Sequence, residues 1–168
     1  QRPLVMEKQL VNANDSLRSD ASLDPAMVDL MLQLPSEAQL HEEAHIIHVD
    51  AIHSARKFVR KALAETLSDK FLAVYQRHNI EQVYAPEAEQ IGRRSLKNVA
   101  LSYLMLIDNI GVDLAWKQFQ SADNMTDKAA ALSCLVNCPA AAVQSAAALA
   151  EFEEQYREEG LVMNLWLQ

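Results

Sequence analysis

Glycine, proline and cysteine are scarce in this sequence of 168 residues, which contains 3, 5 and 2 of them respectively. Antiparallel sandwiches and barrels need frequent turn residues, so this scarcity excludes them as fold classes. Glycine occurs only at positions 92, 111 and 160, so no glycine-rich phosphate-binding loop is present. Two cysteines cannot form a disulfide framework, which indicates a reducing compartment.

Long apolar runs and an excess of basic residues are also missing. No apolar stretch approaches the roughly 20 residues that a membrane-spanning helix needs, and no signal-peptide pattern opens the chain. Lys and Arg number 15 against 23 Asp and Glu, which gives a formal net charge of −8. Nucleic acids and anionic membranes attract basic surfaces, so neither is expected as a partner.

Helix-forming residues dominate the composition. Half of the residues are hydrophobic, and alanine and leucine are abundant. The apolar residues recur at three- and four-residue steps. The sequence therefore predicts an all-α fold: an α-α superhelix, or irregular solenoid, of about eight stacked antiparallel helices in a single domain over residues 1–168. The expected helices cover residues 4–12, 25–34, 36–43, 50–78, 86–110, 112–121, 125–138, 139–159 and the segment from 161 onwards.

Helix boundaries are marked by characteristic residues. Asp24 precedes Pro25, a pair typical of a helix start, because the carboxylate accepts from free amides and proline fits the first helical position. Further expected boundaries are Ser36, Asp50 and either Asn124 or Thr126 as N-terminal caps, and Pro35 and Gly111 as stops. The apolar face expected for the first of these helices consists of Met27, Val28, Leu30, Met31 and Leu34.

One short motif has the pattern of a zinc site. His41, Glu42 and His45 read as H-E-x-x-H, which on a helix places both imidazoles on one face, with the Glu as general base. Zinc peptidases with this motif take a third ligand at a spacing that here falls on Ala64, and Glu65 is one residue late, which rotates its side chain by about 100°. The motif also lies in a short polar segment, so we interpret it as a chance match that holds no metal.

The remaining polar clusters have ordinary structural interpretations. Cys134 and Cys138, four residues apart, lack the further ligands of a zinc site and are expected to be small core residues. Two basic runs, at residues 56–61 and 93–97, are expected to be solvated helix faces paired with acids, for example Lys61 with Glu65. No Ser/His/Asp arrangement can be argued in a helical chain.

Four segments closely resemble bacterial zinc aminopeptidases of the N family, in order and spacing. Residues 121–133 (S-A-D-N-M-T-D-K-A-A-A-L-S) resemble a family turn that precedes an Ala-Leu helix. The other segments are residues 50–56 (D-A-I-H-S-A-R), 94–98 (R-S-L-K-N) and 160–166 (G-L-V-M-N-L-W). The best-matched positions are Asn124, Met125, Thr126 and Asp127, for which we expect a structural role: Asn124 or Thr126 caps the next helix and Met125 fills a neighbouring groove.

The resemblance implies a role without catalysis. In this family the zinc site and the catalytic residues lie in a separate, upstream domain, and the matching part is a helical C-terminal domain that curls over the active site. The resemblance thus implies that the chain is a fragment of that domain with no catalytic residue, no substrate-binding residue that can be named and no cofactor of its own. Its expected partners are the catalytic domain of the parent chain and the parent's peptide substrates, together with further copies of the fragment.

Two other functions stay open at this point. A free-standing helical-repeat module could bind partner proteins along a concave face. A minimal zinc hydrolase could use His41, Glu42 and His45, the residues of the motif above.

Overall fold

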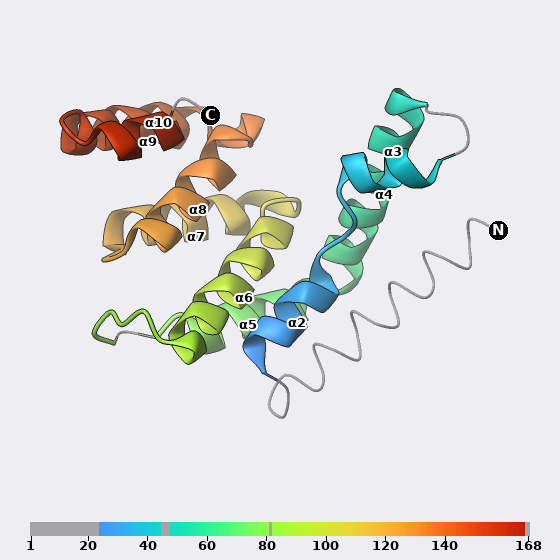
Figure 1. The fold of residues 1–168 in the computed structure, drawn as a ribbon, viewed down its shortest axis with the longest axis horizontal. Helices are drawn as coiled ribbons and strands as arrows, with labels where there is room; N and C mark the ends of the chain where they lie inside the picture. The colour runs from blue at the N-terminus through green and yellow to red at the C-terminus, as the bar shows by residue number, and fades with distance from the viewer. Residues whose placement is uncertain (1–23, 45–47, 81, 167–168) are drawn as a thin grey trace. The chain divides into compact units, whose positions relative to one another are not determined.

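The computed structural model describes residues 24–44, 48–80 and 82–166, without the side chains of residues 108, 109, 165 and 166 (Figure 1). Over these ranges the backbone forms nine α-helices and one short 3-10 helix, and no β-strand. The helix expected near residues 4–12 lies outside the described residues. The chain divides into two compact units, unit 1 (residues 1–111) and unit 2 (residues 112–168), which are described separately.

Unit 1 contains the first five described helices. They are α2 (Pro25–Leu32), α3 (Glu37–Glu43), α4 (Val49–Thr66), α5 (Ser68–His78) and α6 (Ala88–Leu104). Helix α6 is the centre of this unit, because both α5 and α2 pack closely against it. The buried apolar residues of the unit are Val28, Leu32, Leu63, Ala64, Leu67, Phe71, Val74, Tyr75, Leu96, Ala100, Leu101, Tyr103 and Leu104.

Local capping explains where the first two of these helices begin. Asp24 Oδ1 accepts from the Ala26 amide at 3.0 Å, with Pro25 at the first helical position, as predicted. Ser36 forms a reciprocal capping box with Gln39, in which each side chain bonds the other residue's amide. Both predicted starts are confirmed.

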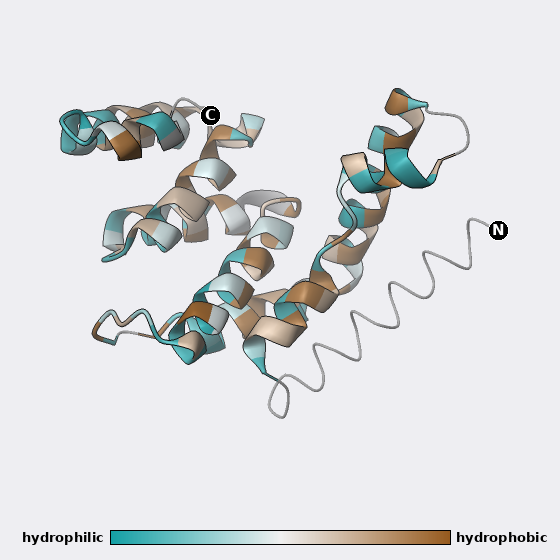
Figure 2. Cartoon of the chain, in the orientation of Figure 1, coloured by the Kyte–Doolittle hydropathy of each residue, from teal (hydrophilic) through white to brown (hydrophobic). Residues whose placement is uncertain are grey.

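The apolar face predicted for α2 is only partly correct. Of the five predicted residues, Val28 is buried, Met27, Leu30 and Met31 are 49%, 64% and 46% exposed, and Leu34 lies beyond the end of the helix. Leu32, which the prediction did not include, is also buried. Helix α2 is drawn largely in the colours of apolar residues (Figure 2), and among the described helices it packs against α6. The side that faces α6 also contains a polar residue: Asp29 is 6% exposed and accepts from Ser95 Oγ of α6 at 2.5 Å.

The helix predicted over residues 50–78 is two helices. The break is at Leu67, whose φ of −116° and ψ of 19° leave the helical region between α4 and α5. Neither glycine nor proline marks this position, so the sequence pattern did not reveal it. Leu67 at the break and Phe71 one turn after it are both buried, and α5 packs along α6. Burial against α6 therefore accompanies the change of direction.

Gly111 does not end a helix, contrary to the prediction. Helix α6 ends at Leu104, and α7 (Asp108–Ser121) has already begun when the chain reaches Gly111. A Cβ atom on Gly111 would lie 2.5 Å from the Leu104 carbonyl oxygen. The glycine is therefore required by a close approach of backbone rather than by a helix stop.

Unit 2 is built from α7 onwards. Its other helices are α8 (Met125–Val136), the 3-10 helix η1 (Pro139–Ala141), α9 (Ala142–Tyr156) and α10 (Gly160–Trp166). Its buried apolar residues are Val112, Ala115, Phe119, Ala131, Leu132, Leu135, Ala141, Ala148 and Phe152. Helix α9 ends at Tyr156 rather than near residue 159, and Gly160 begins α10 rather than closing α9.

The lengths and compositions of the described helices bear on whether any of them could cross a membrane. No single described helix is long and apolar enough to cross a bilayer, and the pair formed by α8 and residues Pro139–Tyr156 reaches that composition only across a bend of 102°.

Candidate functional site

The H-E-x-x-H motif does not lie on a continuous helix. Helix α3 ends at Glu43, and the next residue, Ala44, is extended with φ of −83° and ψ of 126°. His41 and Glu42 are in the last turn of α3, whereas His45 lies outside the described residues. Because the chain leaves the helix before position 45, the face that would unite two imidazoles is interrupted. No group of three or more His, Cys, Asp or Glu side chains that could hold a metal occurs within residues 24–44, 48–80 and 82–166.

The two neighbouring histidines belong to the start of α4. His53 Nδ1 lies 2.8 Å from Glu37 Oε1, and this exposed pair connects α4 to α3. His48 is at the N-cap position of α4 without a side-chain capping bond. Asp50, the predicted cap, is instead in the first turn, where its negative charge interacts favourably with the positive end of the helix dipole. That cap prediction was wrong by two residues.

Cys134 and Cys138 are free thiols at the end of α8. Both are half-buried, and Cys138 lies beyond the helix, immediately before η1. The two cysteines were expected to be core residues, but each side chain is only partly buried.

Two of the basic residues in these runs, Lys61 and Arg93, pair with acids as predicted. Lys61 Nζ lies 3.6 Å from Glu65 Oε1, and Arg93 Nη2 lies 2.5 Å from Glu89 Oε1, both at i,i+4 spacing on exposed helix faces. Arg94 differs, because its guanidinium donates to Gln90 Oε1 at 3.1 Å and lies 4.9 Å above the Tyr84 ring.

The turn before α8 has a structural role. Asn124 caps α8, since its Oδ1 accepts from the Asp127 amide at 2.9 Å and its Nδ2 donates to Asp127 Oδ2 at 3.1 Å. Thr126 is exposed and makes no cap, and Met125 is half-buried. The carbonyl of Asp127 accepts from Gln118 Nε2 of α7 at 3.0 Å, so the turn also fixes α7 against α8. Of the two predicted caps, the structure selects Asn124.

Lys128, which follows this turn, is a buried cation that the sequence analysis missed. Its Nζ donates to Gln155 Oε1 at 2.7 Å and lies 3.8 Å from Glu151 Oε1, both on α9. The same nitrogen lies 4.9 Å from the centre of the Phe119 ring and 5.9 Å from that of Tyr156. A lysine after an N-terminal turn is ordinary in sequence, and only the three-dimensional contacts single it out.

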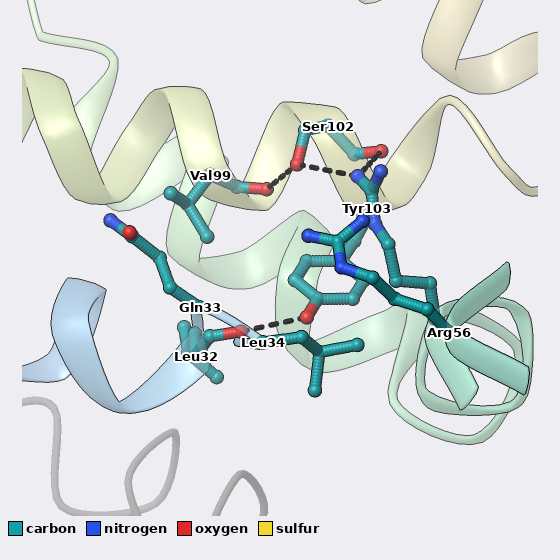
Figure 3. Close-up of a pocket in the computed structure, with 8 residues that line it drawn as sticks. Leu32, Gln33, Leu34, Arg56, Val99, Ser102 and Tyr103 are labelled. Carbon is teal, nitrogen blue, oxygen red and sulfur yellow. Dashed lines mark hydrogen bonds between the residues drawn. The ribbon is translucent and has the colours of Figure 1, made fainter. Parts of the chain in front are cut away.

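The described part of unit 1 contains a cavity of about 190 Å³ (Figure 3). Its lining consists of Leu32, Gln33, Leu34, Arg56, Arg60, Val99, Ser102 and Tyr103. Arg56 Nε donates to the Pro35 carbonyl at 2.8 Å, and Arg60 Nη2 contacts the Ser102 carbonyl and Oγ at 3.4 and 3.3 Å. Neither guanidinium forms an ion pair with a described carboxylate, which corrects the prediction of acid-paired faces for these two residues.

Tyr103 forms the floor of this cavity. Its hydroxyl donates to the Leu32 carbonyl at 2.7 Å, its ring stacks on Phe71 with centroids 4.5 Å apart, and the Arg60 guanidinium carbon lies 5.5 Å from the ring centre. Burial raises the pKa of Tyr103 above its ordinary value of 10.0, although the charges of Arg60 and Arg56 oppose this shift. The hydroxyl therefore remains a hydrogen-bond donor at neutral pH.

A family model matches the entire chain. Residues 1–168 fit the model described as "Domain of unknown function (DUF3458_C) ARM repeats". ARM repeats are stacked helices, so this match agrees with the all-α superhelical fold predicted from the sequence.

Relatives of this chain include aminopeptidases. The chain is 34% identical to aminopeptidase N of Haemophilus influenzae over 97% of its own length, and 35% identical to aminopeptidase N of Escherichia coli over 98%. A crystal structure of Legionella pneumophila aminopeptidase A in complex with aspartic acid superposes on 89% of the chain with a TM-score of 0.73 and 30% identity. The chain spans about a fifth of the length of the two curated relatives, 18% and 19%.

Proposed function

The chain belongs to the DUF3458_C family of ARM repeats, and from this membership we propose that it is a non-catalytic helical segment of a zinc-dependent aminopeptidase that releases N-terminal amino acids from peptides. The observation that carries the proposal is the form of the similarity. It covers 97% and 98% of this chain but 18% and 19% of two aminopeptidases N. A segment of that kind is one domain of a larger peptidase, and homology to aminopeptidases is already established for it.

The H-E-x-x-H motif of this chain is not assigned a zinc ion in this proposal. His41 and Glu42 are the described part of the zinc motif, and they do not fit a helical zinc site because α3 ends at Glu43. We therefore derive no reaction step from this chain. The zinc ion, which would activate the attacking water, belongs in this proposal to another domain of the parent enzyme.

We assign the chain the task of shaping and restricting access to the peptide cavity of the parent. Stacked helices form extended rigid surfaces of this kind. Helix α2 has three exposed apolar side chains, Met27, Leu30 and Met31. Burying them against another part of the parent chain would lower the free energy, because apolar surface is removed from water. In this proposal the partners are the catalytic domain and the peptide substrates, and the location is the cytoplasm.

The same apolar side chains give the isolated chain a tendency to self-associate. Sedimentation velocity at two protein concentrations measures it. A shift towards dimers at the higher concentration is expected, and a monomer at both would contradict this part of the proposal.

Complementation of a truncated parent tests the proposed role. The parent enzyme would be prepared with and without the residues that match 1–168, and each form assayed on an aminoacyl chromogenic substrate and on a longer peptide. We expect the truncated form to bind zinc but to lose the activity of the intact enzyme, and the separately purified chain to restore part of it.

An unrelated helical protein of similar size serves as the control for this experiment. A truncated enzyme that matches the intact enzyme on both substrates, and that does not bind the chain, would contradict the proposal. That outcome would favour the free-standing interaction module instead.

A further inference from the structure

Two arginines on α4 face one cavity, and neither pairs with a carboxylate among residues 24–44, 48–80 and 82–166. Arg56 and Arg60 are one helical turn apart, and both line the cavity between α4, α6 and the segment that follows α2. Two like charges at i,i+4 spacing destabilise a helix by a few tenths of a kcal/mol. Lys61 and Arg93, by contrast, each pair with an acid four residues away on their own helix, Glu65 and Glu89 respectively.

The hydrogen bonds of the two guanidinium groups leave much of their capacity unused. Arg56 donates through Nε to a backbone carbonyl, and Arg60 donates through Nη2 to the carbonyl and hydroxyl of Ser102 at 3.3–3.4 Å. All of these acceptors are neutral. A guanidinium has five N–H groups and binds carboxylates through two parallel bonds. Within the described part of the chain, both terminal nitrogens of Arg56 and one of Arg60 have no acceptor and can donate to an anion.

The rest of the lining is mixed. Leu32, Leu34 and Val99 contribute aliphatic side chains, Gln33, Ser102 and Tyr103 contribute uncharged polar groups, and no carboxylate is among the lining residues. Figure 3 shows Arg56 extending towards Tyr103, with Leu32 and Leu34 on the other side of that ring. The volume of about 190 Å³ is several times the roughly 30 Å³ that one water molecule occupies in the liquid. Because two cationic and three aliphatic side chains line this cavity, it favours a ligand that has both an anionic group and an aliphatic part.

We propose that this cavity binds the carboxylate of a short aliphatic acid. Arg56 and Arg60 donate to the carboxylate oxygens, and Leu34 and Val99 contact the aliphatic part. Inorganic phosphate lacks the aliphatic part and gains less from these walls. The carboxylate comes either from a free acid in solution or from an acidic side chain elsewhere in the parent enzyme. The binding site itself depends only on residues of unit 1. The second source, a side chain of the parent enzyme, rests on the proposed function.

Titration of the folded 168-residue chain tests the proposal. Backbone amide chemical shifts would be recorded by NMR while sodium isobutyrate is added at constant ionic strength, with isobutyramide and sodium phosphate as separate probes. We expect saturable shifts at residues 32–34 and 99–103 with isobutyrate, and at least tenfold weaker binding of the amide and of phosphate.

Variants identify the binding residues. Arg56→Gln combined with Arg60→Gln should weaken isobutyrate binding at least tenfold, and Arg56→Lys with Arg60→Lys should weaken it less, because charge is kept and the two-pronged geometry is lost. Lys57→Gln, which removes one exposed positive charge from the same helix, should leave binding unchanged. Circular dichroism confirms that each variant is folded.

The outcomes separate the site from its occupant. Absence of saturable binding to the folded chain, equal binding of isobutyramide or phosphate, or unchanged binding in the double Gln variant would each overturn the proposal. Repeating the titration with the intact parent distinguishes the two sources. Binding to both proteins supports a free acid, and binding to the isolated chain alone supports a side chain of the parent that already fills the cavity.

Discussion

The ammonium nitrogen of Lys128 lies 4.9 Å from the centre of the Phe119 ring, and the lysine side chain is only 8% exposed. A desolvated cation of this kind is stable because the ring and the α9 residues Gln155 and Glu151 all face it. Lys128 therefore connects α7, α8 and α9 through a single side chain. Lys128 occupies this position in the first turns of α8, the helix that Asn124 caps.

Replacing Lys128 should destabilise unit 2. We expect Lys128→Ala to lower the free energy of unfolding by about 1–3 kcal/mol, because it removes a charge-assisted hydrogen bond, a cation–π contact and buried methylene groups. Urea unfolding followed by tryptophan fluorescence measures this, since Trp116 and Trp166 are both in unit 2. The control is Lys117→Ala, an exposed lysine on α7, which should change stability by less than about 0.5 kcal/mol. Equal effects of the two variants would show that the buried contacts contribute nothing.

Gly111 and Gly160 should respond to alanine in opposite ways. A Cβ on Gly111 would lie 2.5 Å from the Leu104 carbonyl oxygen, whereas nothing lies within 4 Å of a Cβ on Gly160. We expect Gly111→Ala to cost about 1–3 kcal/mol through backbone displacement. Gly160→Ala should be neutral or stabilise by up to about 1 kcal/mol, as alanine favours a helix. Thermal unfolding followed by circular dichroism compares the two variants, and a Gly111→Ala protein as stable as the wild type would contradict the close approach.

The cap of α8 makes a third prediction. Asn124→Ala removes the acceptor of the Asp127 amide and should cost about 1 kcal/mol, while Asn124→Ser keeps a capping oxygen and should cost less. Thr126→Ala is the matched control, because Thr126 is exposed and does not cap the helix. Urea midpoints of the three variants give the order. If Thr126→Ala proved as damaging as Asn124→Ala, Thr126 rather than Asn124 would be the cap.

Tyr103 should make stability depend on alkaline pH. Burial raises its pKa above 10.0 in the folded chain, so its contribution is fully present below pH 10 and is lost as the pH rises through the folded-state pKa. Tyr103→Phe removes both the hydroxyl and its bond to the Leu32 carbonyl, at a cost of about 1 kcal/mol at pH 7. The difference in unfolding free energy between wild type and variant should therefore narrow above pH 10. A difference that stays constant from pH 7 to pH 11 would rule out this titration.

Local sequence signals predicted several local features correctly, although the cap expected at Asp50 was wrong. Asp24 with Pro25, Ser36 and Asn124 each act within three residues of the backbone groups that they cap, so their effect can be inferred without tertiary structure. The Lys61–Glu65 pair was predictable for the same reason, since i,i+4 residues are neighbours on any helix. The fold class followed from helix-forming composition and periodicity.

Features that depend on packing between distant segments were not predictable. The break at Leu67 has no glycine or proline to mark it, and Gly111 is required by a carbonyl seven residues away. The partners of Arg60 on α6 are 42 residues distant in sequence, so its basic run was assigned to a solvated face. The sequence did contain one signal for this exception: Arg56 and Arg60 are four residues apart, and neither has an acid four residues away on the same helix.

Activity of the isolated chain is the most direct measurement of the claim that it is a non-catalytic part of an aminopeptidase. The purified 168-residue chain and the intact parent enzyme would be incubated with an aminoacyl chromogenic substrate, with and without added zinc. The parent should release the chromophore, and the isolated chain should remain at the level of the blank under both conditions. Zinc-dependent release by the isolated chain, abolished by His41→Ala, would contradict the claim and assign catalysis to this segment.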